Sequence, residues 1–335
     1  MKVAINQVSG GSGSDVWARD LCIGLQNSGI SCNLNLYHGF YQLYPDLIPL
    51  RRTISDGADL IQSHTWSGFS FKNEKPLVVT EHGVIHDPQR DLYKSFGQKI
   101  FHKRVFRFEK KSLDVADAVS SVSRFTQSEM ERFFNYYDSI VIYNGIDPDF
   151  FHPQSSEQKS DDLYREKTVL LFVGNLTRMK GADLLPGIME YLGDSFVLLA
   201  TAGFRQNISI SSKNIINIGI LNRAELVTTY HSCDIFLTAS RLEGLNLSVL
   251  EAMACGKPIV ATNCCSFPEQ VVEDKGGFLC EMNNCKDFAE KIQYLAENEG
   301  ERKKMGNFNR DRILERFTLE QMVHGYERLY DSLLN

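Results

Sequence analysis

Short apolar runs alternate with helical patterns along most of this chain of 335 residues. In the first half, runs rich in β-branched residues predict strands at 3–8, 31–37, 60–64, 77–80, 118–122 and 139–143. Apolar residues at helical spacing predict helices that end near 28 and that cover 90–117 and 123–135. Alternating strands and helices predict a parallel sheet, in which functional loops follow the carboxyl ends of the strands.

The same alternation starts afresh in the second half. It predicts strands at 168–174, 196–200, 215–218, 235–239 and 259–262, a Gly276-Gly277 turn, and helices at 223–232, 247–254, 286–297, 301–315 and 319–333. Between the halves, N-G-I-D-P at 144–148 breaks the pattern, and the polar segment 154–167 is interpreted as the interdomain connection. The chain is therefore expected to form two Rossmann-like α/β domains.

Composition narrows the classes of function. The net charge of −6 argues against a general nucleic-acid-binding protein. None of the eight cysteines forms a C-x-x-C pair, which favours buried thiols in a reducing compartment, with a redox-active Cys264-Cys265 pair as the alternative. The N-terminal apolar run is too short for a secretory signal, and no stretch is long enough to span a membrane. We expect a cytoplasmic protein, or one attached to a membrane face.

The stretch from Ser240 to Pro258 has the strongest candidate chemistry. Good helix formers over 247–254 are stopped by Gly256, and either Asn246 or Ser248 suits the N-cap. Glu243 is then in the loop before the helix, and Glu251 is on the helix about a turn in. A helix start favours anions such as a diphosphate, and carboxylates can accept hydrogen bonds from sugar hydroxyls. The alternative is a surface helix with two solvated glutamates.

Loops after other predicted strands carry further candidates. The glycines at 10–13 allow close backbone approach, but they do not spell G-x-G-x-x-G and so give little support to a nicotinamide site. His82 follows a strand and suits hydrogen bonding or proton handling, while His64 is interpreted as structural. Arg178 and Lys180 suit a phosphate. An ordinary loop histidine and solvated loop cations are the alternatives. His86 and Asp87, which follow His82, are weaker candidates for lining the same site.

The helix predicted over 90–117 is basic, in contrast to the acidic whole. Its bases are Arg90, Lys94, Lys99, Lys103, Arg104, Arg107, Lys110 and Lys111. Phe101, Val105, Phe108 and Val115 are expected to face inward, and Phe96, Ile100 and Phe106 to lie among the bases. Two interpretations are open: a solvated basic face, or an interfacial helix that contacts an anionic membrane through residues 90–111.

Several stretches occur in a characteristic order. They are G-G-S-G at 10–13, T-E-H-G at 80–83, N-G-I-D at 144–147, V-G-N-L-T-R-M-K-G at 173–181, E-G-L-N-L-S-V-L-E-A-M-A-C-G-K-P-I-V-A-T at 243–262, F-P-E-Q-V at 267–271 and G-G-F-L at 276–279. In this order and spacing the chain resembles the GT-B glycosyltransferases, and within them the large retaining family 4. The resemblance covers essentially the whole chain and is strongest in the second half.

The resemblance implies an architecture. Two Rossmann-like domains with parallel sheets would face each other across a cleft, and the C-terminal helix would cross back to the first domain. Residues 1–148 with the helix 318–334 would form the acceptor-binding domain, and residues 149–317 the nucleotide-sugar-binding domain.

The resemblance also implies roles. His82, Lys180 and Glu243 would form the catalytic set: His82 beside the transferred sugar, Lys180 neutralising the diphosphate with help from Arg178, and Glu243 contacting the sugar. Glu251 would hold the ribose hydroxyls. The full donor-binding set would be Gly11, Gly13, Asn175, Arg178, Lys180, Gly244, Leu245, Asn246, Leu247 and Glu251.

The implied activity is transfer of a hexose from a UDP- or GDP-sugar to a glycan or lipid-linked saccharide, with retention of configuration. It would serve cell-surface polysaccharide or glycolipid biosynthesis at the inner face of the cytoplasmic membrane, with neither a metal nor a cofactor. The family usually has Arg where this chain has Asn175, and Gly-Gly where it has Cys265-Ser266. A non-catalytic relative that binds sugar nucleotides or acts as a scaffold is the alternative, whereas a GT-B epimerase or phosphorylase lacks support.

Overall fold

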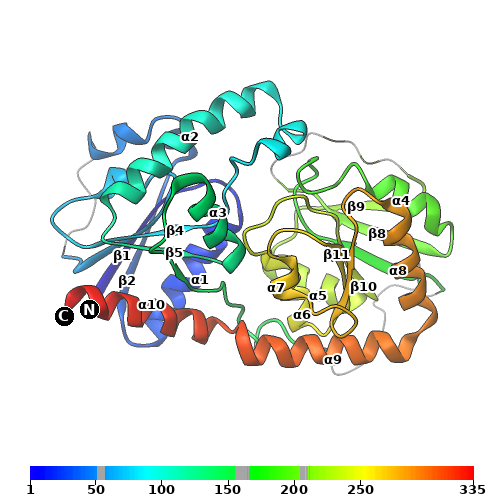
Figure 1. Ribbon diagram of the computed structural model, residues 1–335. Helices are drawn as coiled ribbons and strands as arrows, with labels where there is room; N and C mark the ends of the chain where they lie inside the picture. Colours follow the sequence, from blue (N-terminus) through cyan, green and yellow to red (C-terminus); the bar gives the residue numbers. More distant parts are fainter. Residues whose placement is uncertain (51–56, 155–163, 165, 204–207, 209, 211) are drawn as a thin grey trace. The chain divides into compact units, whose positions relative to one another are not determined.

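The computed structural model describes residues 1–50, 57–154, 164, 166–203, 208, 210 and 212–335 (Figure 1). These residues divide into two compact units, Met1–Gly145 with Leu319–Asn335 (unit 1) and Ile146–Thr318 (unit 2). Each unit holds a parallel sheet of six described strands flanked by helices, as the α/β prediction required. Most of the segment predicted as the interdomain connection, at 155–163 and 165, lies outside the described residues.

In unit 1 the described strands follow the order β2-β1-β3-β4-β5-β6. They are β1 (Lys2–Val8), β2 (Ser31–Tyr37), β3 (Leu60–His64), β4 (Leu77–Glu81), β5 (Ala118–Ser121) and β6 (Ile140–Val141). The helices are α1 (Gly13–Asn27), α2 (Phe96–Val115), α3 (Arg124–Phe134) and α10 (Leu319–Leu334), with short 3-10 helices η1 (Gly39–Gln42), η2 (Pro45–Leu50), η3 (Gly68–Phe71) and η4 (Pro88–Tyr93) in the loops.

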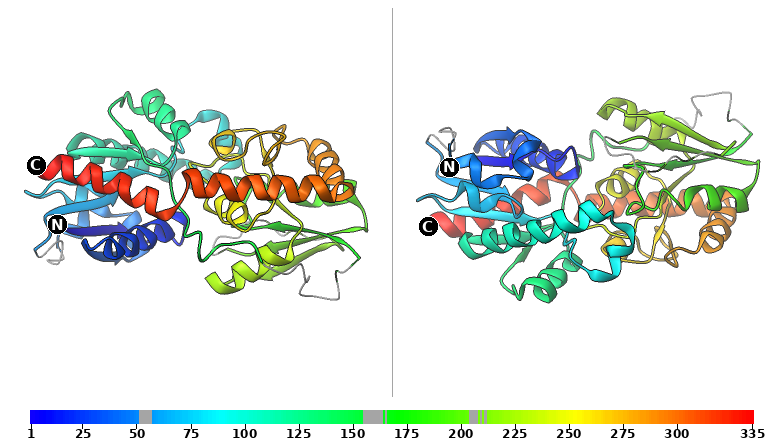
Figure 2. Two further views of the ribbon diagram at one scale, coloured as in Figure 1. Left: turned by 90° about the horizontal axis from the view of Figure 1, so that it is seen from below. Right: turned by 90° about the horizontal axis from the view of Figure 1, so that it is seen from above.

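The two faces of this sheet bury different helices, because successive strand residues point to opposite sides. Val78 belongs to the apolar cluster that includes residues of α1 and α10, whereas its neighbours Leu77 and Val79 belong to the cluster with residues of α2 and α3. The C-terminal helix α10 therefore completes the core of unit 1, beside α1 (Figures 1 and 2). A Cβ on Gly24 of α1 would lie 2.4 Å from Val323, so glycine permits this close helix contact.

Unit 2 repeats the architecture with the strand order β12-β11-β10-β7-β8-β9. Its strands are β7 (Thr168–Phe172), β8 (Phe196–Thr201), β9 (Ile215–Gly219), β10 (Ile235–Thr238), β11 (Ile259–Thr262) and β12 (Gly277–Cys280). Its helices are α4 (Leu185–Leu192), α5 (Arg223–Ser232), α6 (Leu247–Ala254), α7 (Phe267–Gln270), α8 (Cys285–Glu297) and α9 (Glu299–Arg316). Helices α4 and α8 share one apolar cluster with the strands, while α5 and α6 pack on β7, β10 and β11.

The direction of strand succession reverses between β7 and β10, which are neighbours in the sheet. From β7 the chain moves outward through β8 and β9, and from β10 it moves outward the other way through β11 and β12. Loops after the carboxyl ends of two such strands diverge and leave a crevice, where ligands of open α/β sheets bind.

The helix predicted over 90–117 is wrong at its start. Residues 88–93 form the separate 3-10 helix η4, and α2 begins only after Ser95. Ser95 and Gln98 form a capping box, in which the Ser95 hydroxyl accepts from the Gln98 amide at 3.2 Å and the Gln98 side chain accepts from the Ser95 amide at 2.8 Å. Pro88 starts η4 in the same way as a first-turn proline starts a helix.

Two smaller expectations are also corrected. Val115, expected to face inward with Val105 and Phe108, is 38% exposed, because it is the last residue of α2 and lies beyond the packed part of that helix. Gly277, expected in a turn, starts β12 and pairs with Ile259 of β11. A Cβ there would lie 1.8 Å from the Ile259 carbonyl oxygen, so a glycine is required where the two backbones meet.

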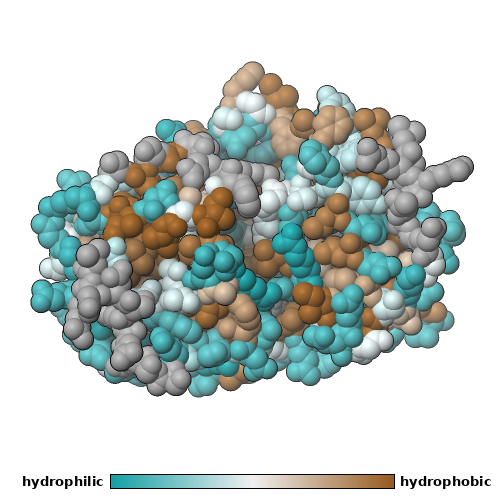
Figure 3. Space-filling model, turned by 180° about the vertical axis from the view of Figure 1, so that it is seen from behind, coloured by the Kyte–Doolittle hydropathy of each residue, from teal (hydrophilic) through white to brown (hydrophobic). Residues whose placement is uncertain are grey.

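No helix in the described part of the chain is both long enough and apolar enough to cross a membrane. The face shown in Figure 3 carries both apolar and polar side chains.

The loop after β7 packs directly on the end of β10. Its Gly181 has φ +72°, and a Cβ would lie 2.0 Å from the carbonyl oxygen of Ala239. We expect Gly181→Ala to lower the free energy of unfolding by about 3 kcal/mol or more, because the left-handed strain adds to a backbone clash. Urea denaturation measures the change.

Gly29→Ala is the control, since Gly29 has φ +83° but no heavy atom within 4 Å of its built Cβ. The control is expected to lose about 1 kcal/mol from backbone strain alone. Equal losses in the two variants would contradict the close approach at Gly181.

Candidate active site

The two loops that leave the β7–β10 switch point meet through a partly buried ion pair. Lys180, after β7, places its Nζ 2.6 Å from Oε1 of Glu243, after β10. The amide Nδ2 of Asn246 donates to the same oxygen at 3.0 Å. Because the side chains of Lys180 and Glu243 are only 30% and 10% exposed, this carboxylate is largely withdrawn from water and faced by a cation and an amide donor.

Asn246 also starts α6. Its Oδ1 accepts from the Val249 amide at 3.1 Å, so Asn246 rather than Ser248 is the N-cap. The side chain of Gln270 makes two hydrogen bonds to the backbone of Asn246. It donates to the carbonyl at 2.8 Å and accepts from the amide at 3.1 Å. The first-turn amides of Leu247 and Ser248 have no carbonyl partner within the helix, as in any helix start, and the dipole there favours an anion.

Glu251 lies one turn into α6 and is 8% exposed. The hydroxyl of Tyr230, on α5, donates to its Oε2 at 2.7 Å. Burial, and then the charge of Glu251, raises the pKa of Tyr230 well above its ordinary value. Glu251 is therefore held by a second helix, which the spacing of the two glutamates did not reveal.

Arg241 fixes both loops. Its guanidinium binds Asp183 through two bonds of 2.7 and 3.0 Å, and Nε donates to Asn283 at 2.7 Å. Its Nη1 also donates to the carbonyl of Arg178, and its backbone amide donates to the carbonyl of Met179 at 2.8 Å. With only 3% of its surface exposed, Arg241 joins the loop that carries Lys180 to the loop that carries Glu243.

The remaining predicted donor-site residues of unit 2 surround this centre. Arg178 is exposed on the Lys180 loop, and Gly244 and Leu245 are buried between Glu243 and α6. Asn175 packs against Gly203, where a Cβ would lie 1.7 Å from the Asn175 oxygen. The structure thus gathers Lys180, Glu243, Asn246 and Glu251 on adjoining elements of one unit.

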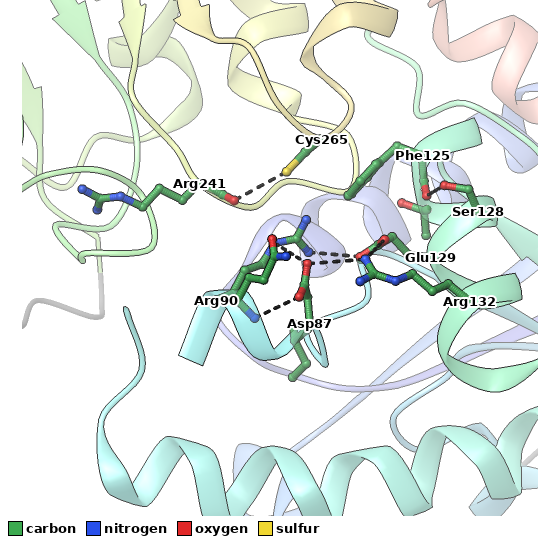
Figure 4. A network of polar contacts seen from close by, with 12 residues as sticks. Asp87, Arg90, Phe125, Ser128, Glu129, Arg132, Arg241 and Cys265 are labelled. Carbon is green, nitrogen blue, oxygen red and sulfur yellow. Dashed lines mark hydrogen bonds and ion pairs between the residues drawn. The ribbon is translucent and has the colours of Figure 1, made fainter. Parts of the chain in front are cut away.

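Cys264 and Cys265 border the same backbone. Their thiols lie 3.5 Å from the carbonyl oxygens of Ser240 and Arg241 respectively, as drawn for Cys265 in Figure 4. Cys265 has φ +55°, the conformation that favours the glycine expected there from family resemblance.

In unit 1, Asp15 lies in the first turn of α1 and binds the glycine-rich loop after β1. Its Oδ2 accepts from the amides of Gly10 and Gly11 at 3.2 and 2.8 Å and from the hydroxyl of Ser9 at 2.8 Å, and its Oδ1 accepts from Gln7 at 2.8 Å. The Asp15 carboxylate therefore accepts hydrogen bonds from the amides of Gly10 and Gly11, although Gly11 was expected to bind the donor. Gly11 has φ +60°, and Gly13 begins α1.

His82 follows β4 and packs edge-on against Trp17, with the ring centroids 4.6 Å apart. Burial, and then the charge on His64, lowers the pKa of His82 to about 3, so the imidazole is neutral near pH 7. Its Nε2 is buried and meets no hydrogen-bond partner among the described residues. His64 has a structural role, as expected: its Nδ1 accepts from the Trp66 amide at 3.2 Å, and its Nε2 contacts Ser67.

A buried acid cluster lies beside the same loop. Glu81 accepts from Thr65 at 2.7 Å and from the Gly83 amide at 2.8 Å, and burial followed by the charge of Glu109 raises its pKa to about 7. Glu109 is bonded to Nε2 of His86. Burial raises the pKa of Glu109 well above its usual value and lowers that of His86 to about 4, so burial disfavours the charged form of each partner.

The segment after His86 is locked by a four-charge network (Figure 4). Arg90 contacts Glu129 at 3.2 Å and Asp87 at 3.9 Å, and Arg132 contacts Glu129 at 3.5 Å and Asp87 at 3.6 Å. Asp87, predicted only weakly as a site residue, therefore serves to fasten η4 to α3.

Sequence reasoning missed Tyr230, Arg241, Gln270 and Asp15. An acidic residue two positions into a helix that follows a glycine-rich loop is a readable signal for Asp15. The other three make contacts that depend on distant parts of the chain, for which the local sequence contains no signal.

The raised pKa of Glu81 leads to a prediction about how stability depends on pH. Because the pKa of Glu81 rises from its usual 4.5 to about 7 on folding, the folded state binds the proton more tightly, and stability falls as pH rises from 4.5 to 7. Glu81→Gln removes this loss. We expect its stability relative to wild type to increase across that window, by on the order of 1–3 kcal/mol, and to level off above pH 7.

Denaturant melts at pH 5, 6, 7 and 8 measure the difference. Glu320→Gln, at an exposed position of α10, controls for the change in net charge. A Glu81→Gln difference that does not vary with pH would show that Glu81 is ionised throughout.

Comparisons with known proteins identify the family of this chain. Residues 154–312 match the family model described as glycosyl transferases group 1, and residues 13–150 match that described as glycosyltransferase family 4. An uncharacterised glycosyltransferase of Methanocaldococcus jannaschii is 27% identical over 295 residues, which are 83% of this chain and 77% of that protein. The N,N'-diacetylbacillosaminyl-diphospho-undecaprenol alpha-1,3-N-acetylgalactosaminyltransferase of Campylobacter jejuni is 28% identical over 201 residues, 57% of this chain and 53% of that protein.

Solved structures share the fold over its full length. Sucrose-phosphate synthase from Thermosynechococcus elongatus matches with a TM-score of 0.85 and 18% identity, covering 99% of both chains. Anabaena HepE in complex with UDP-glucose matches with a TM-score of 0.78 and 16% identity, covering 99% of this chain and 100% of that one. The two family models follow each other along nearly all of the sequence, and the chain belongs to the GT-B glycosyltransferases of family 4.

Proposed function

We propose that this protein is a retaining hexosyltransferase. It transfers a hexose from a UDP- or GDP-sugar to a glycan or lipid-linked saccharide, in the biosynthesis of a cell-surface polysaccharide or glycolipid. One observation carries the proposal: Lys180, Glu243 and Asn246 meet at the start of α6, with Glu251 fixed one turn further along. A cation, helix-start amides and two buried carboxylates suit the diphosphate and the hydroxyls of one nucleotide sugar.

Stabilising the leaving group is the main chemical task. Transfer breaks the bond between the anomeric carbon and the diphosphate oxygen, and negative charge grows on the diphosphate as the sugar becomes oxocarbenium-like. The Lys180 ammonium neutralises that charge, with help from Arg178 and from the first-turn amides of α6. A metal is not required for this stabilisation. The acceptor hydroxyl attacks from the face that the diphosphate leaves, its proton passes to a leaving phosphate oxygen, and configuration is retained.

Glu243 and Glu251 accept from different hydroxyl groups of the donor. Glu243 contacts the transferred sugar, and backbone groups of Gly244, Leu245 and Asn246 receive sugar or diphosphate oxygens. Glu251 holds the ribose. The contributions of Gly11, Gly13 and His82 from unit 1 remain predictions from family resemblance.

Lys180→Ala is expected to lower kcat/KM by about 100-fold to 10,000-fold, because it removes the ammonium that meets the diphosphate charge. A thermal-shift screen of UDP-, GDP- and ADP-sugars first selects the donor, and NMR of the first-formed product measures both rate and anomeric configuration. Lys213→Ala is the control, since this lysine is 75% exposed and pairs with Asp194.

Three outcomes would each remove part of the proposal. An inverted anomer in the first-formed product would overturn retention. Full activity of Lys180→Ala would remove the assigned role of that lysine. A protein that binds a sugar nucleotide but neither transfers nor hydrolyses its sugar would instead be the non-catalytic relative, for which the asparagine at position 175 in place of the usual arginine is the one favouring observation.

We further propose that the start of α2 contacts an anionic membrane. Phe96 is 80% exposed and Ile100 57% exposed, within a turn of the basic residues Lys99 and Lys103. Exposed apolar side chains among cations suit the interface of an anionic bilayer, where the acceptor would be a lipid-linked saccharide. Such a protein would work at the cytoplasmic face of the membrane.

Charge reversal at Lys99, Lys103 and Arg107 is expected to reduce sedimentation with anionic vesicles by at least tenfold at low salt, since each base near the surface contributes about 1 kcal/mol. The control reverses three exposed bases of unit 2, Lys275, Lys303 and Lys304, and changes net charge equally. Equal binding by the two triple variants would remove the membrane role of α2.

A further inference from the structure

A buried tyrosine lies behind the Glu251 carboxylate. We propose that Tyr230 is a positioning residue for nucleotide binding, whose hydroxyl fixes the orientation in which Glu251 meets the donor. The proposal rests on the proposed function, in which Glu251 binds the ribose, and it assigns a role to a residue that the motifs around Glu243 and Glu251 do not contain.

The hydroxyl of Tyr230 has one proton and two acceptors within reach. The Glu251 Oε2 atom lies at 2.7 Å and the Ser248 carbonyl oxygen at 3.2 Å. The shorter, charge-assisted bond to the carboxylate takes the proton. Because burial raises the pKa of Tyr230 well above its ordinary value, the hydroxyl remains a donor over the whole working range of pH.

Packing holds the ring of Tyr230 in place, so its hydroxyl cannot move together with the Glu251 carboxylate. The tyrosine is fully buried, with the ring of Phe236 on β10 at 5.9 Å and the ring of Phe151 at 6.2 Å. Phe151 is itself held, since Arg310 donates to its carbonyl at 2.9 Å and the Arg223 guanidinium lies 5.5 Å from its ring centroid. The donor atom is thus anchored to β10 and to the first residues of unit 2, and it restrains Glu251 from a second element.

This restraint matters for a diol ligand. Two neighbouring ribose hydroxyls need acceptors at a fixed separation, and a carboxylate supplies them only in a restricted set of rotations. Binding a carboxylate that is already oriented avoids the entropy of fixing its side chain. The hydroxyl of Tyr230 also favours the ionised form of Glu251, which is the form that accepts from both hydroxyls.

Tyr230→Phe tests the proposal, because it removes only the hydroxyl and keeps the ring. We expect the KM for the nucleotide sugar to rise about fivefold to tenfold, with kcat within twofold of wild type, because donor binding must then order the Glu251 side chain.

Tyr330→Phe is the matched control, since that tyrosine is also fully buried and its hydroxyl donates to neutral Gln62 at 3.0 Å in unit 1. Glu251→Gln separates the proposals. If Glu251→Gln leaves donor KM unchanged, the proposed ribose contact is wrong. If Glu251→Gln raises KM while Tyr230→Phe does not, Tyr230 has no positioning role. In the double variant, Tyr230→Phe should add less than twofold to the effect of Glu251→Gln, and full additivity would overturn the inference.

A variant that melts below the assay temperature is still informative. Its melting temperature is then compared with wild type, with Glu251→Gln and with the double variant. If the hydroxyl acts through the carboxylate, Tyr230→Phe should lower the melting temperature less in the Glu251→Gln background than in wild type. Equal losses in the two backgrounds would indicate packing alone and overturn the proposal.

Discussion

The reversal of strand order between β7 and β10 is the constraint on which the candidate site depends. Adjacent parallel strands end at the same sheet edge, so the loops that follow them must start side by side and then diverge. That geometry brings Lys180 to Glu243 although 63 positions separate them in the chain. A carboxylate placed at such an edge is shielded from water and must be partnered, and Lys180 and Asn246 supply the partners.

Holding two divergent loops requires a rigid connection, and Arg241 provides it. A guanidinium has its five donors in one plane, so a single buried side chain can bind the Asp183 carboxylate with two bonds and still reach the Arg178 carbonyl and Asn283. A lysine could not make these bonds in fixed directions. Arg241 therefore helps to position Lys180 by bonding the loop that carries it, in addition to the contact of Lys180 with Glu243.

The sequence predicted α6 and the described strands other than β12, and it singled out Lys180, Glu243 and Glu251 as candidates, because periodicity, caps and loop composition are local signals. The true start of α2 could also have been predicted, since Ser95 and Gln98 have the sequence pattern of a capping box. Tyr230 and Arg241 could not be predicted in their roles. A tyrosine in a helix and an arginine beside a loop have many partners available, and only packing decides that Tyr230 meets Glu251 and that Arg241 meets Asp183.

The buried acidic side chains of the two units have different surroundings. In unit 1, burial raises the pKa values of Glu81 and Glu109, the charge of Glu109 adds to the rise at Glu81, and burial lowers the pKa of His86, which meets Glu109. In unit 2, Glu243 faces an ammonium and Glu251 a tyrosine hydroxyl. Sugar hydroxyls need acceptors, and a protonated carboxyl is a poorer one. Burial alone therefore does not make a sugar-binding carboxylate: the donors behind it decide whether it can accept from a ligand in front.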